Sequence, residues 1–256
     1  MKLRVTVLGS GTSLGVPMIA CRCKVCTSGN PKDKRLRPSV LIQVGDKNIV
    51  IDIGPDFRMQ MLNNDIRHVD GILMTHSHRD HTAGLDDLRA FNWLNKKAVR
   101  MYAEQPVIEV LKHDFWYAFT ETKFEGLPDI EFQAIDDKPF TMEGVEIVPV
   151  RLMHHRLPVL GYRVGDFSYL TDTNFVPHDE YAKLKGTKVL IVDGLRFEEH
   201  ISHFNIKQAL ELIEEIRPEK AYITHISHQL GLHDEINAKL PANVELAYDG
   251  LVLDLN

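Results

Sequence analysis

The sequence predicts an α/β fold in which two β-sheets pack face to face and helices cover their outer surfaces. Strand-turn-strand units are followed by strand-helix units, and this order recurs in two similar halves of the chain. With 256 residues, 44% of them hydrophobic, the chain is long enough for one large domain. The sequence contains no linker, repeat or low-complexity segment, so we expect a single domain over residues 1–256.

Short β-branched and apolar runs mark the expected strands. The earlier runs are Leu3–Leu8, Val40–Val44, Asn48–Asp52, Val69–Met74, Val99–Ala103, Glu131–Ile135 and Val145–Val150. The later runs are Leu160–Val164, Phe167–Leu170, Val189–Asp193, Ala221–Thr224, Val244–Ala247 and Leu251–Asp254. Two glycine-aspartate pairs, Gly45-Asp46 and Gly165-Asp166, each separate two of these runs and predict hairpin turns.

Helical periodicity is clearest in three segments, Ala83–Leu94, Pro106–Phe119 and Asn205–Ile216. In the last of these, the apolar residues fall on one helix face, which predicts packing against a sheet. Pro218 follows directly and should end that helix, because proline disfavours helical backbone in the residue before it.

Composition excludes several classes of function. The formal net charge is −6 and no Lys/Arg-rich block occurs, which argues against a nucleic-acid partner. No apolar run approaches the roughly 18 residues that span a bilayer, so no membrane partner is expected. The chain starts without a signal-peptide pattern, and we expect a cytoplasmic protein. The oligomeric state is open, with a homodimer as one option.

A histidine-rich turn, His76-Ser77-His78-Arg79-Asp80-His81, carries the strongest chemical signal. It follows the run Val69–Met74 and precedes the helix expected to open near Ala83, which places it on a strand-to-helix loop. In extended backbone, residues two apart point the same way, so the first two histidines can reach one metal ion and the remaining pair a neighbouring one. Four ligands within six residues therefore predict two metals. The alternative is a solvated polar loop, which this ligand density disfavours.

The pattern His-x-His-x-Asp-His after a hydrophobic strand resembles the signature of the metallo-β-lactamase superfamily. The resemblance covers nearly the whole chain and implies a four-layer αββα sandwich of two mixed β-sheets flanked by helices. It also implies a histidine at a later strand end, a bridging aspartate and a last histidine near the C-terminus. The matching positions are His154, Asp172 and His225, and His155 is the rival of His154.

By this resemblance, His76, His78 and His154 hold one metal. Asp80, His81 and His225 hold the other, and Asp172 bridges the two. Two cations that share an aspartate and a water would lower the pKa of that water, which suits phosphodiester hydrolysis. Mixed imidazole and carboxylate ligands accept manganese, zinc or iron. A redox diiron branch of the fold has a glutamate where His78 stands, so the sequence favours hydrolysis, with Asp80 counted among the catalytic residues.

Three cysteines, Cys21, Cys23 and Cys26, crowd into six residues, in a loop at about 20–27. They cannot form a disulfide framework but suit thiolate ligands of a structural zinc, which needs a fourth donor. Three small buried cysteines are the alternative. Together with Leu8–Ser13, the segment resembles the phosphoribosyl cyclic phosphodiesterase family of the carbon-phosphorus lyase pathway. That resemblance implies His228 as the fourth zinc ligand.

The same family resemblance implies a histidine general acid at His203, in the segment His200-Ile-Ser-His-Phe-Asn205. A departing ribose oxygen needs a proton when the ester bond breaks, and histidine is suited to supply it. His200 is the rival, and a plain surface histidine is the alternative for either position. His233 could reach the substrate, although a surface histidine at a helix start is the preferred interpretation.

The preferred function is therefore a metal-dependent phosphodiesterase for a small cyclic or nucleotide-like phosphodiester. An endonuclease that processes tRNA 3′ ends and a thioester or lactone hydrolase are alternatives of the same fold. A zinc-stabilised binding module is the alternative without catalysis. The loops Leu94–Ala98 and Lys123–Asp129 are expected to line the pocket and select the physiological substrate, which the sequence does not reveal.

Overall fold

The computed structural model describes residues 2–120 and 126–255. Over these residues the chain forms two seven-stranded sheets, ordered β14-β1-β2-β3-β4-β5-β6 and β13-β12-β11-β10-β9-β8-β7. The first sheet contains β1 (Leu3–Gly9), β2 (Ser39–Val44), β3 (Lys47–Ile51), β4 (Gly71–Leu73), β5 (Val99–Ala103), β6 (Ile130–Ala134) and β14 (Val252–Leu255). The second contains β7 (Phe140–Met142), β8 (Val145–His154), β9 (Leu157–Val164), β10 (Phe167–Leu170), β11 (Val189–Asp193), β12 (Lys220–Thr224) and β13 (Val244–Leu246).

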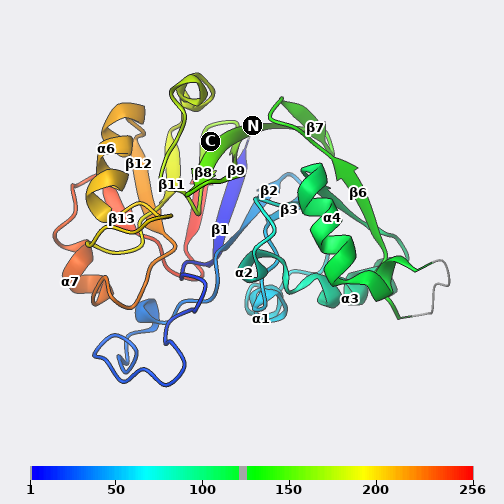
Figure 1. The fold of residues 1–256 in the computed structure, drawn as a ribbon, viewed down its shortest axis with the longest axis horizontal. Coiled ribbons are helices and arrows are strands. Elements are labelled where there is room, and N and C mark those ends of the chain that lie inside the picture. Colours follow the sequence, from blue (N-terminus) through cyan, green and yellow to red (C-terminus); the bar gives the residue numbers. More distant parts are fainter. Residues whose placement is uncertain (1, 121–125, 256) are drawn as a thin grey trace.

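Helices lie on the outer sides of both sheets (Figure 1). They are α1 (Phe57–Asn63), α2 (Arg79–Thr82), α3 (Arg89–Asn95), α4 (Gln105–Asp114), α5 (Tyr181–Leu184), α6 (Ile206–Ile216) and α7 (His233–Asn237). Single 3-10 turns occur at Pro31–Asp33, Leu85–Leu88, Trp116–Phe119 and His178–Glu180. No helix in the described ranges is long and apolar enough to cross a membrane.

Both sheets are mixed, and their pairing explains where the functional residues gather. Strands β3 to β6 pair in parallel, as do β10 to β13, whereas β1, β2 and β14 and the strands from β7 to β10 pair antiparallel. Parallel neighbours end at the same edge of a sheet, so the loops that follow them converge there. The predicted hairpins are confirmed, because Val44 pairs with Lys47 and Val164 with Phe167.

The hydrophobic core has the layers that the sequence predicts. One cluster between the sheets joins Val5, Ile42 and Ile49 of the first sheet to Tyr162 and Tyr169 of the second. Two further clusters bury the outer faces, one beneath α1, α3 and α4 and the other beneath α6. The αββα sandwich is therefore confirmed.

The helix predicted over Ala83–Leu94 is wrong in its start and its continuity. Helix α2 already begins at Arg79, so Asp80 and His81 lie on a helix instead of a loop. The chain then breaks at Gly84, where an added Cβ would lie 2.3 Å from the Gly54 carbonyl oxygen. Such a close backbone approach requires glycine and separates α2 from the later helical turns.

Other differences concern short elements. The segment predicted over Pro106–Phe119 divides into α4 and a 3-10 turn. Strand β7 and helices α1 and α5 were not predicted, since elements of three to seven residues show little periodicity. Of the loops expected to select the substrate, Leu94–Ala98 is described, whereas residues 123–125 of Lys123–Asp129 lie outside the described residues.

Candidate active site

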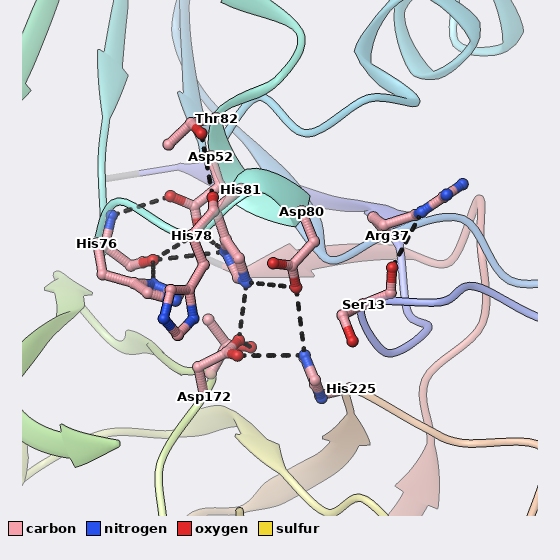
Figure 2. A network of polar contacts seen from close by, with 12 residues as sticks. Ser13, Arg37, Asp52, His76, His78, Asp80, His81, Thr82, Asp172 and His225 are labelled. Carbon is pink, nitrogen blue, oxygen red and sulfur yellow. Dashed lines mark hydrogen bonds and ion pairs between the residues drawn. The ribbon is translucent and has the colours of Figure 1, made fainter. Parts of the chain in front are cut away.

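Polar side chains from both sheets meet beyond the carboxyl ends of the strands (Figure 2). The histidine-rich turn follows β4, and His154 is the last residue of β8. Asp172 follows β10, and His225 follows β12 directly. This arrangement brings together residues that are up to 149 positions apart in sequence, from His76 to His225.

One group of potential metal ligands contains His76, His78 and His154, whose ligand atoms lie within 4.8 Å of one another. His154 Nδ1 lies 2.9 Å from the Ser202 carbonyl oxygen, to which it can donate, so its Nε2 is left for a ligand role. His155 is exposed, with a backbone φ of 57° where the chain turns after β8. The structure therefore brings His154 into the group and leaves His155 outside it.

A second group contains Asp80, His81, Asp172 and His225. The two carboxylate oxygens of Asp172 face different histidines, with Oδ2 lying 3.0 Å from His81 Nε2 and Oδ1 lying 3.2 Å from His225 Nε2. Asp80 Oδ2 lies 3.2 Å from His81 Nε2. Asp172 also falls within reach of His154, so it lies between the two groups, where a bridging ligand would be.

The donor atoms of this cluster fit metal ions. In the described part of the chain, His76 Nε2 and His225 Nδ1 are buried without a partner, while His81 Nε2 and His225 Nε2 face carboxylates without a well-formed hydrogen bond. Buried polar atoms are normally satisfied, so such a set points to a ligand. Burial lowers the pKa of His76 well below its ordinary value, which keeps its imidazole neutral and able to bind a cation.

Carboxylates dominate the electrostatics of the second group. Burial lowers the pKa of His225, but Asp172 and Asp80 outweigh it and raise that pKa to about 10. Burial likewise opposes protonation of His81, yet its neighbouring carboxylates raise its pKa well above the ordinary value. Protons and metal ions compete for the same nitrogen lone pairs. The negative field that favours a proton here would equally favour a divalent cation.

Two aspartates orient the histidines and were not singled out from the sequence. Asp52 Oδ2 lies 2.6 Å from His81 Nδ1 and accepts a hydrogen bond from the Thr75 hydroxyl. Asp193 Oδ2 lies 2.7 Å from His203 Nδ1 and accepts the Thr173 backbone N–H. Carboxylates that accept from a ring N–H fix the tautomer and the orientation of that ring. The sequence signal that could have identified these two aspartates is their position, because Asp52 directly follows a buried strand and Asp193 ends one.

Backbone strain also marks this site. Asp52, Asp172 and His225 have φ angles of 62°, 52° and 59°. Residues other than glycine seldom adopt this left-handed region, and strained backbone clusters at functional sites. Each of the three follows a strand, so the strain turns the side chain toward the point where the sheets meet.

His203 lies against the cluster of potential metal ligands, and His200 lies farther out. The His203 ring centroid is 4.7 Å from that of His154 and 4.4 Å from that of His225, stacked on the latter. His203 is buried, whereas His200 is half-buried. The Phe204 N–H donates to the Thr173 carbonyl oxygen and the Leu195 N–H donates to the Phe204 carbonyl oxygen, and these two bonds hold the segment just before α6.

The three cysteines and His228 form a separate, partly buried group. Their ligand atoms lie within 4.8 Å of one another, with His228 Nδ1 at 3.3 Å from Cys23 Sγ. The backbone N–H of Cys26 and the His228 ring lower the pKa of the Cys23 thiol to about 6, which favours the thiolate. Burial raises the pKa of Cys26 to about 11. Four donors at this spacing fit one tetrahedral zinc ion.

The expectation of a surface position for His233 is wrong. It begins helix α7, as expected, but its side chain is buried. Its Nδ1 lies 3.0 Å from a guanidinium nitrogen of Arg35, which is also buried. This contact joins residues 198 positions apart and leaves no local pattern in the sequence.

Comparisons with known proteins agree with this geometry. The family model of the β-lactamase superfamily domain matches residues 47–226. An octanoyltransferase of Porphyromonas gingivalis is 41% identical over 252 residues, which are 97% of this chain and 51% of that protein. Coenzyme PQQ synthesis protein B of Methylobacterium radiotolerans is 34% identical over 101 residues, 34% of each protein. The chain thus spans about half or less of the length of these curated relatives.

Solved structures resemble the whole chain. The crystal structure of a diphosphatase from the PhnP family has a TM-score of 0.94 and 39% identity, covering 100% of this chain and 98% of its own. Zinc-bound PqqB from Methylobacterium extorquens has a TM-score of 0.77 and 18% identity, with coverage of 98% and 100%, which shows the fold alone. These matches support the prediction of a metal-dependent hydrolase. The chain belongs to the metallo-β-lactamase superfamily, and within it resembles the PhnP family.

Proposed function

We propose that the chain is a metal-dependent phosphodiesterase that hydrolyses a small cyclic or nucleotide-like phosphodiester. The observation that carries the proposal is the buried His203–Asp193 pair beside a seven-residue ligand cluster. The PhnP-family diphosphatase, 39% identical over the whole chain, supports a substrate whose reacting centre is phosphorus. Packing of both sheets on one shared core supports a single hydrolase domain over residues 1–256.

In this proposal the cluster holds two divalent cations, manganese or zinc or iron. One ion would be held by His76, His78 and His154, the other by Asp80, His81 and His225, with Asp172 between them. When bound, such a pair would lower the pKa of a water and neutralise charge on the phosphoryl oxygens. Cys21, Cys23, Cys26 and His228 would hold a structural zinc.

The chain's own residues complete the reaction. His203 directs Nδ1 toward Asp193, so its Nε2 is the atom that can give a proton to the departing oxygen. The Asp193 carboxylate would hold the ring in place and stabilise its protonated form. Stacking on His225 sets His203 at the edge of the ligand cluster, close to the bond that breaks.

The alternatives have less support. A tRNA 3′-end nuclease needs a surface that binds a polyanion, whereas this chain has a net charge of −6. Human tRNase Z, short form, has 19% identity and a TM-score of 0.69, a likeness of fold alone. Octanoyl transfer is the named activity of a relative about twice as long as the matched region. No residue of the described cluster favours thioester over phosphodiester hydrolysis.

The proposal is tested with bis-p-nitrophenyl phosphate and ribose cyclic phosphates in the presence of Mn²⁺. His78→Ala removes one proposed ligand and should lower kcat/KM roughly a thousandfold, since a bound cation contributes several kcal/mol to catalysis. His113→Ala, at an exposed position of α4, is the control and should retain full activity. Unchanged hydrolysis by His78→Ala would contradict the proposal.

The leaving group separates the role of His203 from general loss of structure. A nitrophenolate departs without a proton, whereas a ribose alkoxide needs one. His203→Asn should therefore lower hydrolysis of ribose cyclic phosphate by about 10²- to 10⁴-fold and leave bis-p-nitrophenyl phosphate much less affected. His200→Asn should show no such selectivity. Selective loss in His200→Asn instead would move the general acid to that residue.

A further inference from the structure

The buried guanidinium of Arg35 lies between the cysteine loop and the segment that carries His225. Arg35 is 4% exposed. Its Nη1 donates hydrogen bonds to the Ser10 hydroxyl at 2.8 Å and to the Ala247 carbonyl oxygen at 2.5 Å. Its Nη2 lies 3.0 Å from His233 Nδ1. Three parts of the chain that are distant in sequence thus meet at one side chain.

Arg35 also closes the cysteine loop through its backbone. Its N–H donates to the Val16 carbonyl oxygen at 2.7 Å, and the Val16 N–H donates to the Arg35 carbonyl oxygen at 2.9 Å. All three cysteines lie between these two residues. The residue at the base of the loop is therefore the one whose side chain enters the interior.

Ser10 connects this guanidinium to the active site. The Ile226 N–H donates to the Ser10 carbonyl oxygen at 2.9 Å, and Gly11 and Ile226 form a parallel bridge. Ile226 directly follows His225, a proposed ligand with a strained backbone. Asp249 accepts hydrogen bonds from both the N–H and the hydroxyl of Ser10, at 2.9 and 2.8 Å. Ser10 is thus fixed from two sides while its backbone positions the residue after His225.

The backbones of Gly11 and Arg35 pack so closely that neither can move independently of the other. A Cβ on Gly11 would lie 2.9 Å from Arg35 Cβ and 3.0 Å from the Arg35 carbonyl oxygen, so the two backbones pack directly on each other. Within residues 2–120 and 126–255 no carboxylate forms a direct salt bridge with Arg35, and the more distant charges of Asp249 and Asp33 compensate its burial only in part, so its pKa is lowered to about 10. A buried guanidinium without an ion pair is costly, because burial disfavours its charge. Ordinary surface packing of the loop would not require such a group.

We propose that Arg35 is a positioning residue through which the closed cysteine loop fixes His225, and thereby supports binding of the second catalytic cation. The inference rests on the proposed function, because it concerns the ion assigned to Asp80, His81 and His225. Arg35 itself contacts none of these ligands. Its effect passes through Ser10 and Ile226 to the backbone of His225.

The test compares Mn²⁺ binding by wild type and Arg35→Met, each prepared with zinc in the cysteine loop. Electron paramagnetic resonance distinguishes a coupled Mn²⁺ pair from a single bound ion, independently of activity. In Arg35→Met the first ion should bind as in wild type, while the second should bind about 10- to 100-fold more weakly, as is typical when an outer support of a ligand is lost. If Arg35→Met binds both ions as tightly as wild type does, the inference is overturned.

Arg163→Met is the matched control. Arg163 is a half-buried arginine that donates to the carbonyl oxygens of Gly165, Lys183 and Lys185, away from the ligand cluster. Its loss should lower the melting temperature but leave the coupled Mn²⁺ signal unchanged. A similar weakening of the second ion in this control would assign the effect to general destabilisation and overturn the inference.

Two further variants keep the test informative if Arg35→Met does not fold. Ser10→Ala removes only the hydroxyl shared by Arg35 and Asp249 and should weaken the same ion by a smaller factor. Arg35→Lys keeps the charge but not the forked geometry, so it should restore binding only in part. If wild type binds no pair of ions, the proposed function and the inference both fail. If wild type binds the pair and hydrolyses phosphodiesters while Ser10→Ala binds both ions normally, only the inference fails.

Discussion

The two ligand clusters of this molecule differ in number of donors, in burial and in what holds them. The cysteine cluster has four donors, three of them within six residues of one loop. The histidine–carboxylate cluster has seven donors, which come from strand ends of both sheets and from α2 and are mostly buried. Four donors complete the coordination of one tetrahedral ion, whereas seven donors over two ions leave positions for water and substrate. Under the proposed function, the first cluster would contribute stability and the second would carry the chemistry.

The supports of the two clusters differ in the same sense. Backbone N–H groups of Met18 and Cys26 donate to the cysteine sulfurs. The side-chain carboxylate of Asp52 instead orients the ring of His81 in the histidine–carboxylate cluster, and that of Asp193 orients His203 beside it. Precise placement of reacting groups needs such supports on rigid elements. An ion with a purely structural role does not need such precise placement, so its ligands can lie on a loop.

The largest expected effect comes from removing the charge between the two proposed catalytic ions. Asp172→Asn keeps the shape of the side chain but should lower kcat/KM for phosphodiesters by roughly a thousandfold or more, because a neutral amide bridges two cations poorly. Steady-state kinetics with added Mn²⁺ measure the loss. Asp166→Asn, in the turn after β9, is the control and should be fully active. Full activity of Asp172→Asn would contradict a catalytic role for the histidine–carboxylate cluster.

A smaller effect is expected from the support of the general acid. Asp193→Asn should lower hydrolysis of ribose cyclic phosphate by about 10- to 100-fold, as is typical for loss of an orienting carboxylate. Because Asp193 acts through His203, adding Asp193→Asn to His203→Asn should lower the rate of hydrolysis little further. Kinetics of the two single variants and the double variant measure this coupling. If the rate loss of the double variant equals the product of the two single losses, Asp193 does not act through His203.

The smallest expected effect concerns pH and the buried network beside the cysteine loop. Burial and the Arg35 charge lower the pKa of His233 to about 4, so the folded state loses stability as pH falls from about 6.5 toward 4. Burial raises the pKa of Asp249 to about 6, so the folded state gains stability as pH falls through 6. The two effects oppose each other in wild type.

His233→Gln removes the first of these effects and leaves the second. The free energy of unfolding of the variant, relative to wild type, should therefore rise on acidification from about pH 7.5 to 4.5, by an amount on the order of 1 kcal/mol. Urea unfolding of both proteins at the two pH values measures it, and loss of metal at low pH cancels in the difference. If the free energy of unfolding of His233→Gln falls relative to that of wild type on acidification, the predicted direction is wrong.

Prediction from the sequence succeeded where the signal was local. The strands Val99–Ala103, Phe167–Leu170 and Val189–Asp193 match the structure at both ends, because each is a short and mostly apolar run. Helix α2 was misplaced because the break at Gly84 depends on Gly54, thirty residues earlier in the chain. Contacts of this kind cannot be predicted from periodicity.

The site follows the same division. The spacing of the ligands from His76 to His81 was enough to predict a metal site. The structure places His154, Asp172 and His225 of the second sheet beside this motif. Asp52 and Asp193 were missed because a single aspartate after a strand has no spacing pattern. The burial of His233 was missed because it depends on Arg35, which reaches it only in the folded chain. The ligand assignments themselves stay a prediction until metals are measured.

Stepwise removal of metal ions tests the central claim most directly. Metal content, phosphodiesterase rate and melting temperature would be followed on the same samples as a chelator is added. We predict about three ions per chain at the start, loss of activity as the first two leave, and the main fall in melting temperature when the zinc bound by the cysteines and His228 leaves. Activity that persists when only the cysteine-bound ion remains would contradict the account.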